Sequence, residues 1–348
     1  MIQFLDQNFS QLNHFLTKDT YSRIFILVDE NTHENCLPIL LGNLETSTEI
    51  EILEIEAGEE MKNIQTAIHL WEILTEMHAD RKALIVNLGG GVVTDMGGFV
   101  AATYKRGISF INVPTTLLAM CDASIGGKTG IDLMHYKNMV GTFSLPEHIF
   151  VYPSFLSTLP SDQLLSGFAE MLKHGLIADK NHWNSLTQIS DLDAENIIPH
   201  VKRSMEIKQN VVDKDFHEEN IRKTLNFGHT IGHSLESLFL EDNTPILHGE
   251  AVALGMICET YLSKLENLIS EEQSETIIKG IRSKFSTIDI SKYSNEAIVA
   301  ILVNDKKNSN SNINFSLLHC IGAAVFNHQC QTENIVKSLN YYRNLCNN

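Results

Sequence analysis

The feature that most constrains the fold is a short apolar run, Ala83–Leu88, that leads directly into three consecutive glycines, Gly89–Gly91. The run ALIVNL is typical of a buried strand, and the residues from the glycines to Arg106 are compatible with a helix. Glycines let the backbone approach a bound phosphate closely, and a helix N-terminus offers free N–H groups to an anion. The turn therefore predicts a nucleotide-binding loop, with a tight turn that binds nothing as the alternative.

Neither glycine cluster in this half of the chain matches a standard nucleotide signature. In GGGVVTDMGG, the third glycine of the GxGxxG dinucleotide fingerprint would fall on Thr94. The second cluster, SIGGKT, ends like a Walker A loop, but the first glycine of that pattern would be Asp122. We therefore do not interpret the second cluster as an ATP site.

Strand and helix signals alternate through the first 150 residues. Strands are expected at 23–29, 50–55, 83–88, 108–114 and 148–152, and an amphipathic helix is expected between Met61 and Met77. This alternation is typical of a mostly parallel sheet that binds ligands at the carboxyl ends of its strands. After about Pro160 the segments suit helices, with INFSLL as a short strand; the expected helices are 163–177, 196–212, 223–240, 250–268 and 271–285.

Length and composition add bounds on organisation and partners. A chain of 348 residues exceeds the usual size of a single core, so we expect two domains, 1–158 and 159–348. The net charge of -17 argues against a nucleic-acid partner.

Six cysteines without a CxxC pair indicate reduced thiols. No signal-like N-terminus and no apolar run of about 18 residues is present, so we expect a cytoplasmic protein that is not associated with a membrane.

A histidine pair in RKTLNFGHTIGHSLE is the clearest indication of chemistry in the second half. His229 and His233 are four residues apart and would project from one face of a helix. His248 follows a loop that could return it to that helix, and Glu170 with Lys173 lies upstream. Catalytic zinc usually takes three His, Asp or Glu ligands and keeps one position open. A chance pair in a chain with 15 histidines is the alternative.

Seven motifs together resemble the 3-dehydroquinate synthase family over about residues 29–322. In chain order they are GGGVVTDMGGFVAATYKRG, INVPTTLLAMCDASIGGKTGID, KNMVGTF, GFAEMLKHG, LNFGHTIGHSLE, LHGEAVALGM and DKKN. The resemblance implies a Rossmann-like, NAD-binding α/β N-terminal domain and an all-α C-terminal domain that binds a metal. The implied cofactors are NAD and Zn²⁺, with Co²⁺ as the alternative metal, and the implied assembly is a homodimer.

The resemblance also assigns site residues position by position. The implied metal ligands are Glu170, His229 and His248. The implied catalytic residues are Lys128, Lys173, Lys208, Arg222, Asn226 and His233, and Asn138 and Lys306 (or its neighbour Lys307) would bind substrate. The implied NAD contacts are Asp29, Glu59, Lys62, Gly91, Val92, Val93, Thr94, Asp95, Thr115, Thr116, Lys128, Lys137, Phe155, Leu156, Ser157 and Thr158. Tyr152 and Asn220 depart from the family pattern at positions that are not ligands.

The implied reaction converts 3-deoxy-D-arabino-heptulosonate 7-phosphate, a phosphorylated sugar acid, to 3-dehydroquinate and phosphate in the shikimate pathway. Such an enzyme is a carbon–oxygen lyase in which NAD is reduced and then reoxidised. Two alternatives use the same cofactors: another sugar-phosphate cyclase, or a polyol dehydrogenase that depends on a metal and NAD. A binding protein without activity would be expected to have lost a ligand or an anion-holding lysine, and none is missing.

Overall fold

A computed structural model describes residues 1–18, 21–134, 136–304 and 313–346. The chain folds into two compact units, Met1–Leu164 and Leu165–Asn348, so the division falls inside helix α6 (Ser161–Ala178). The sequence placed the boundary after residue 158. Lys306 and Lys307, one of which was expected to bind substrate, lie outside the described residues. Among the described helices, none is long and apolar enough to cross a membrane.

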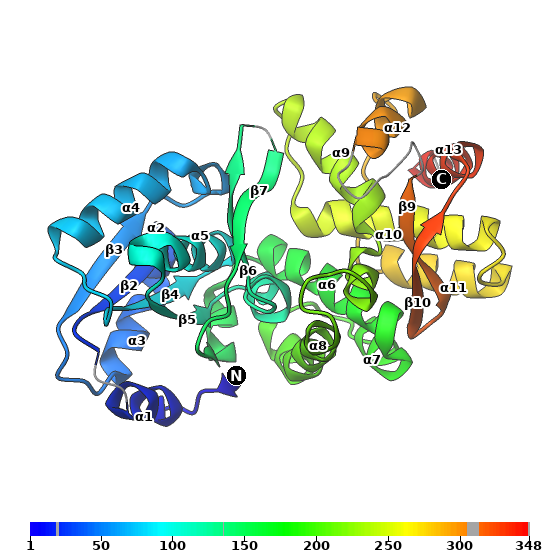
Figure 1. The fold of residues 1–348 in the computed structure, drawn as a ribbon. Helices are drawn as coiled ribbons and strands as arrows, with labels where there is room; N and C mark the ends of the chain where they lie inside the picture. The colour runs from blue at the N-terminus through cyan, green and yellow to red at the C-terminus, as the bar shows by residue number, and fades with distance from the viewer. Residues whose placement is uncertain (19–20, 135, 305–312, 347–348) are drawn as a thin grey trace. The chain divides into compact units, whose positions relative to one another are not determined.

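Unit 1 contains a six-stranded sheet in the order β1-β8-β5-β4-β2-β3. Figure 1 labels β5, β4, β2 and β3 of this sheet. All five neighbouring pairs are parallel, which confirms the predicted α/β class. The strands are β1 (Ile2–Phe4), β2 (Ile24–Asp29), β3 (Ile50–Ile55), β4 (Leu84–Gly89), β5 (Ser109–Pro114) and β8 (Ile149–Val151). The helices are α1 (Ser10–Lys18), α2 (Glu30–Asn35), α3 (Leu37–Asn43), α4 (Ile64–Glu76) and α5 (Gly91–Thr103). Short 3-10 turns span Glu59–Met61, Tyr104–Arg106 and Pro153–Thr158, and a π-helical turn spans Ala119–Ala123.

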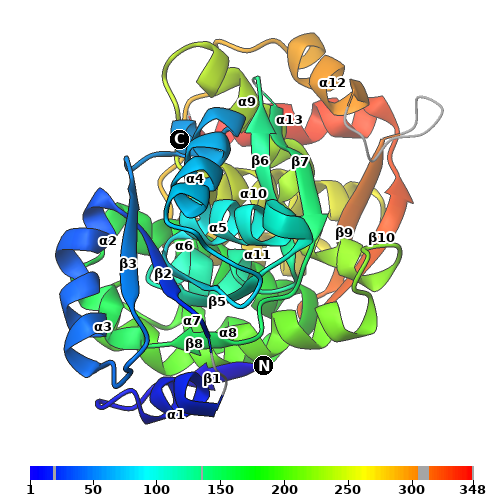
Figure 2. The same ribbon diagram turned by 60° about the vertical axis from the view of Figure 1, so that its left-hand side comes forward.

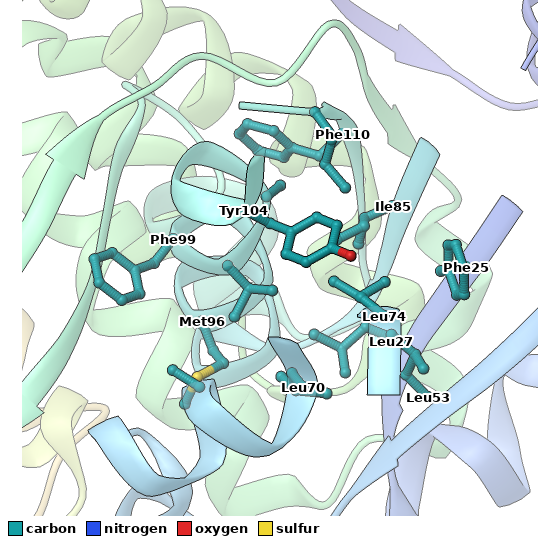
Figure 3. Close-up of a cluster of buried hydrophobic side chains, with 14 of the residues drawn as sticks. Phe25, Leu27, Leu53, Leu70, Leu74, Ile85, Met96, Phe99, Tyr104 and Phe110 are labelled. Carbon is teal, nitrogen blue, oxygen red and sulfur yellow. The ribbon is translucent and has the colours of Figure 1, made fainter. Parts of the chain in front are cut away.

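One face of this sheet is covered by α4 and α5 through a buried apolar cluster (Figure 3). Phe25 and Leu27 are two residues apart on β2 and therefore point to the same face of the sheet. They join Leu70 of α4 and Met96 of α5 in the cluster, and each of these four side chains is at least 99% buried. The apolar side chains on this face of the sheet thus hold α5 in position, together with the glycine turn at its start.

A two-stranded antiparallel hairpin, β6 (Lys128–Leu133) and β7 (Tyr136–Phe143), completes unit 1 (Figure 2). The two strands approach each other closely at a glycine pair. A Cβ on Gly130 would lie 2.7 Å from the carbonyl oxygen of Val140, and a Cβ on Gly141 would lie 2.3 Å from that of Thr129. The sequence analysis did not identify this hairpin, although both of its strands lie in motifs of the resemblance.

Unit 2 is helical, as predicted, but it is not all-α. Its helices are α6, α7 (Lys180–Thr187), α8 (Ala194–Lys214), α9 (His229–Glu241), α10 (His248–Leu265), α11 (Glu271–Arg282), α12 (Asn295–Asn304) and α13 (Thr332–Cys346). A 3-10 turn spans Ile221–Asn226. An antiparallel hairpin of β9 (Asn314–Cys320) and β10 (Ala323–Gln329) accompanies them, and β9 contains all but the first residue of the run expected to form a strand.

The single helix expected at 223–240 is interrupted at Gly228. This residue has φ 80°, in the left-handed region that glycine adopts without strain, and it directly precedes α9, after a 3-10 segment that ends at Asn226. The apolar periodicity on both sides of the break hides it from pattern analysis. His229 is therefore the first residue of its helix, and His233 lies one turn further along the same helix.

Candidate active site

The glycine turn of unit 1 presents a helix N-terminus without a side-chain cap. β4 ends at Gly89, Gly90 precedes the helix, and no side chain hydrogen-bonds the first N–H groups of α5 among the described residues. A Cβ on Gly91 would lie 3.4 Å from that of Ala123, which is ordinary contact, so the fold itself does not require this glycine. An uncapped N-terminus at the carboxyl edge of a parallel sheet suits an anionic group such as a pyrophosphate.

Three residues from separate segments meet beside this turn. The ammonium of Lys62 lies 2.6 Å from Oδ2 of Asp95 and donates a hydrogen bond of 2.7 Å to Oδ1 of Asn138. The Lys62 side chain is only 5% exposed. Burial alone would lower its pKa, but the carboxylates of Asp95 and Glu59 outweigh that effect and raise the pKa to about 12. Lys62 is therefore a permanent buried cation that fixes Asp95 and Asn138 in place.

Several other residues expected to contact NAD lie along the same edge of the sheet. The N–H of Thr115 donates to the carbonyl of Gly89, and a Cβ on Gly90 would lie 3.0 Å from Cγ2 of Thr116. Oγ1 of Thr115 is buried and has no hydrogen-bond partner among the described residues. At the end of β2, the Asp29 carboxylate accepts the N–H of Thr32 and so caps α2.

The remaining positions differ in how much of their side chain a ligand could reach. Nζ of Lys137 lies 3.8 Å from Oε1 of Glu59. Lys128 is the first residue of β6 and has an exposed side chain. Phe155 and Leu156 are buried in the core, so their side chains offer no surface. Val93 and Thr94 are buried in α5, and the Thr94 hydroxyl donates to the carbonyl of Gly90. The hydroxyls of Ser157 and Thr158 donate to backbone carbonyls within their own 3-10 turn.

In unit 2, three helices bring together the residues expected to bind a metal. Nε2 of His229 lies 3.3 Å from Oε1 of Glu170, and Nε2 of His248 lies 3.4 Å from the same oxygen. The ligand bonds of tetrahedral zinc, about 2.0 to 2.2 Å long, place neighbouring donor atoms about 3.3 Å apart or slightly more. Glu170 is fully buried, and neither of its oxygens accepts a hydrogen bond of normal geometry from the described residues. The three donors therefore fit a divalent cation.

Each imidazole has an acceptor at its other nitrogen. Nδ1 of His229 donates to the carbonyl of Phe227 over 3.1 Å, which leaves Nε2 with a lone pair facing Glu170. Nδ1 of His248 lies 3.6 Å from Oε2 of Glu236. Acceptors in this position set the tautomer and orientation of metal-binding histidines. Sequence analysis gave Glu236 no role, although it lies seven residues after His229 and therefore on the same side of the helix.

Charge in this cluster is distributed unequally. Burial alone would raise the pKa of Glu170, but Lys173, with which it forms a buried ion pair, and His229 hold that pKa well below its usual value. Burial and Lys173 lower the pKa of His229. For His248, burial is outweighed by the carboxylates of Glu170 and Glu236, which raise its pKa to about 10. An ionised carboxylate beside a neutral imidazole is the kind of donor set that a dication stabilises.

His233 provides a second way to complete a metal site. Single donor atoms of His229, His233 and His248 all lie within 4.8 Å of one another. Their ring centroids are 5.0 to 5.7 Å apart. The geometry therefore allows a three-histidine set, or a set with Glu170 in which His233 remains beside the metal. The position of Glu170 favours the second set, because its Oε1 lies 3.3 and 3.4 Å from the Nε2 atoms of His229 and His248.

Three basic residues near this cluster in the sequence are buried, although isolated basic residues are usually solvated. Lys173, Lys208 and Arg222 are 1%, 6% and 3% exposed. The carboxylate of Asp215 accepts the N–H groups of Arg222, Asn220 and Glu219 and so folds the loop before the 3-10 turn. Asn226 donates to Glu218 over 2.7 Å. Buried cations are costly unless they serve an anion.

The two departures from the family pattern have local structural roles. Tyr152 packs edge-on against the rings of Phe9 and Phe155. Asn220 has φ -133° and ψ -112°, outside the helical and extended regions, and its N–H donates to Asp215. Neither departure lies at a proposed ligand position.

Glu259 is a further residue that sequence analysis missed. It is fully buried on α10, and its two oxygens accept the N–H groups of Gly228 over 2.6 Å and of Ile231 over 3.0 Å. It therefore supplies from a neighbouring helix the cap that Gly228 cannot provide for α9. No local signal could reveal this contact, because the partners are separated by about thirty residues.

Comparison with known proteins gives a consistent result across the chain. Residues 52–166 match the family model described as 3-dehydroquinate synthase N-terminal, and residues 167–308 match the one described as 3-dehydroquinate synthase C-terminal. A 3-dehydroquinate synthase of Parabacteroides distasonis is 42% identical over 338 residues, which cover 96% of this chain and 95% of that protein.

Solved structures share the fold. A 2-deoxy-scyllo-inosose synthase, solved with carbaglucose-6-phosphate, NAD⁺ and Co²⁺, superposes with a TM-score of 0.86 at 24% identity, covering 98% of this chain and 96% of that one. A 2-epi-5-epi-valiolone synthase from Streptomyces hygroscopicus, solved with NAD⁺ and Zn²⁺, gives a TM-score of 0.85 at 23% identity, covering 99% and 97%. At this identity the likeness bears on the fold.

The cap from Glu259 leads to a prediction about α9. Glu259→Gln replaces one accepting oxygen with an amide nitrogen, which leaves a buried N–H without its partner, so the free energy of unfolding should fall by about 2 kcal/mol. Because the same N–H groups hold the start of α9, the affinity for zinc should fall about ten-fold or more. Urea denaturation and competitive zinc titration measure the two effects. Exposed Glu275→Gln is the control, and equal zinc affinity in both variants would argue against a positioning role.

Proposed function

The chain belongs to the 3-dehydroquinate synthase family, and we propose how its described residues carry out that family's reaction. The enzyme is a carbon–oxygen lyase that converts 3-deoxy-D-arabino-heptulosonate 7-phosphate to 3-dehydroquinate and phosphate, a step of aromatic amino acid biosynthesis. The observation that carries the proposal is the convergence of Glu170, His229 and His248 from three helices in unit 2. The two alternatives, another cyclase and a polyol dehydrogenase, are not favoured by the named relatives.

Unit 1 would hold NAD along the carboxyl edge of its sheet. The N-terminus of α5 is suited to the pyrophosphate, and Gly91 leaves room for close approach of its backbone. Asp95, fixed by Lys62, and the unsatisfied hydroxyl of Thr115 offer polar groups to the rest of the cofactor. Asp29, at the end of the neighbouring strand, keeps accepting oxygens at the same edge.

Unit 2 would hold the metal with Glu170, His229 and His248. A divalent metal bound there supplies a Lewis acid that acidifies a substrate hydroxyl, and NAD supplies a reversible acceptor for the hydride. The residues of the chain then have three tasks, which are orientation of the substrate, retention of its anionic groups and movement of protons. Glu236 and the Phe227 carbonyl keep the two imidazoles in the orientation that binds metal.

The buried cations would hold the substrate's carboxylate and phosphate. Lys173, Lys208 and Arg222 lie in a protein with a net charge of -17, so an anionic substrate must be attracted by local groups. Arg222 is oriented by Asp215 through its backbone, and its Nη1 donates to the carbonyl of Phe216. His233, one turn beyond a proposed metal ligand, would exchange a proton with the substrate, because an imidazole can both give and accept a proton.

Two further features of the enzyme are proposed on narrower grounds. A homodimer is supported by large apolar side chains that the β6–β7 hairpin and the loop after it expose, namely Leu133, Met134, Phe143 and Leu145. Action in the cytoplasm is supported by the six cysteines, which form no disulfide within the part of the chain that the structure describes.

The activity is tested by the balance of products. With the heptulosonate phosphate as substrate, catalytic NAD and added zinc, the enzyme should release one equivalent of inorganic phosphate per turnover without net NADH. Phosphate detection combined with NADH absorbance distinguishes the classes. Stoichiometric NADH without phosphate would instead identify a polyol dehydrogenase.

The placement of NAD predicts the effect of one glycine substitution. Gly91→Val should weaken NAD binding at least ten-fold, because its side chain would occupy the space next to the N-terminus of α5. Calorimetric titration of NAD measures the affinity. Gly42→Val is the matched control, since no atom lies within 4 Å of a Cβ at that position. Unchanged affinity in a folded Gly91→Val protein would refute the placement.

The two histidines of α9 should respond differently to substitution. His229→Ala removes a proposed ligand, so both bound zinc and turnover should be lost. His233→Ala should retain its zinc and lose most of its turnover, because only the proposed proton carrier is missing. Elemental analysis alongside steady-state kinetics gives both quantities. Loss of zinc from His233→Ala would instead support the three-histidine ligand set.

A further inference from the structure

A second group of metal-binding side chains lies in unit 2 and takes no part in the proposed reaction. Glu266, His328 and Cys330 each place one donor atom within 4.8 Å of the others. Glu266 follows the last residue of α10, His328 lies near the end of β10, and Cys330 follows that strand. Carboxylate, imidazole and thiolate are all ligands of zinc, and a set containing a thiolate favours zinc over magnesium or calcium.

Local backbone features direct the two hairpin residues toward Glu266. The pairing of β10 with β9 shifts register between Val325 and His328, which marks a bulge. Asn327, inside that bulge, has φ 56° in the left-handed region. Bulges re-aim side chains, and residues two apart in an extended segment point to the same side. The bulge thus presents His328 and Cys330 together.

Glu266 is held in place by groups on two other segments. Its Oε2 lies 3.2 Å from Nε2 of His328, and its Oε1 accepts a hydrogen bond of 2.9 Å from Nδ2 of Asn334 on α13. The side chains of Glu266 and His328 are 16% and 29% exposed, so a cation could reach them from solvent. An amide that fixes a ligating carboxylate is a common element around metal sites.

The Cys330 thiol distinguishes this cluster from an ordinary ion pair. Burial raises its pKa, and the nearby carboxylates of Glu266 and Glu259 raise it further. A thiol of this kind is protonated at neutral pH and reacts slowly with oxidants, which argues against a redox role. A divalent cation bound by the Cys330 sulfur would also balance the negative charge of the Glu266 carboxylate beside it.

We propose that Glu266, His328 and Cys330 form a second site for a zinc-type divalent cation, separate from the catalytic cluster. The three ligands leave a fourth position for water, since the cluster is partly exposed. The cation would join the end of α10, the end of β10 and, through Asn334, the start of α13. It would therefore stabilise unit 2 and raise the temperature of unfolding as its concentration rises.

Cobalt reports on this site separately, because thiolate bound to Co²⁺ gives a charge-transfer band that Glu, His and His ligands cannot give. Titration of the metal-free full-length protein with Co²⁺ should produce this band in the near ultraviolet. Cys330→Ser should abolish the band, and His328→Asn should weaken binding by about a hundred-fold. Asn334→Ala removes a group behind a ligand and should weaken binding about ten-fold.

Matched controls come from the other end of the same hairpin. Cys320→Ser and His319→Asn alter the same residue types on β9, and both variants should keep the wild-type band and affinity. Thermal unfolding of Cys330→Ser without metal should match that of the wild type, which shows that the substitution leaves the fold intact. Absence of a thiolate band at saturating Co²⁺, or its persistence in Cys330→Ser, would overturn the proposal. Neither result bears on the catalytic metal, whose proposed ligands contain no sulfur.

Discussion

The close approach of α9 and α10 is the contact on which the proposed metal centre depends. A Cβ on Gly255 would lie 1.9 Å from the carbonyl oxygen of Gly228, and one on Gly232 would lie 2.7 Å from that of Ala251. Only glycine fits at these positions without moving backbone. Since His229 begins α9 and His248 begins α10, the distance between the helices sets the distance between the two imidazoles. The close contact between α9 and α10 is therefore needed for the proposed metal site as well as for the packing of the core.

The position of Glu170, the third proposed ligand, also depends on a close approach between two helices. A Cβ on Gly249 would lie 2.2 Å from the carbonyl oxygen of Ser166, and the N–H of Gly249 donates to Oγ of Ser166. Ser166 lies one turn before Glu170 on α6, so the start of α10 is held directly against the helix that carries the carboxylate. The buried charges of Glu170, Lys173 and Glu259 would be costly in an ordinary core. That cost is accounted for by the proposed site, in which Glu170 and Glu259 would place the metal ligands and Lys173 would bind a charged substrate.

Sequence patterns predicted those parts of the structure that depend on local information. The strand before Gly89 and the parallel class follow from apolar runs and glycine turns, and the structure has both. The break at Gly228 and the hairpin at Gly130 were missed, because each depends on a close approach between segments and not on the propensity of the residues. The ligand candidates came from motifs, but the roles of Glu236 and Glu259 exist only in the folded unit, where helices distant in sequence meet.

The two proposed metal clusters of unit 2 lie at opposite ends of helix α10, and their metals would therefore have different effects on the protein. His248 is its first residue and Glu266 follows its last, and 18 residues at 1.5 Å each separate them by about 27 Å. The helix is buried along most of its length and packs against α9, α11 and α13, so it transmits little deformation between its ends. A cation at the second cluster would therefore change the stability of the unit while leaving the position of His248, and hence turnover, nearly unchanged. Stability and catalysis would then depend on two ions held at opposite ends of one helix.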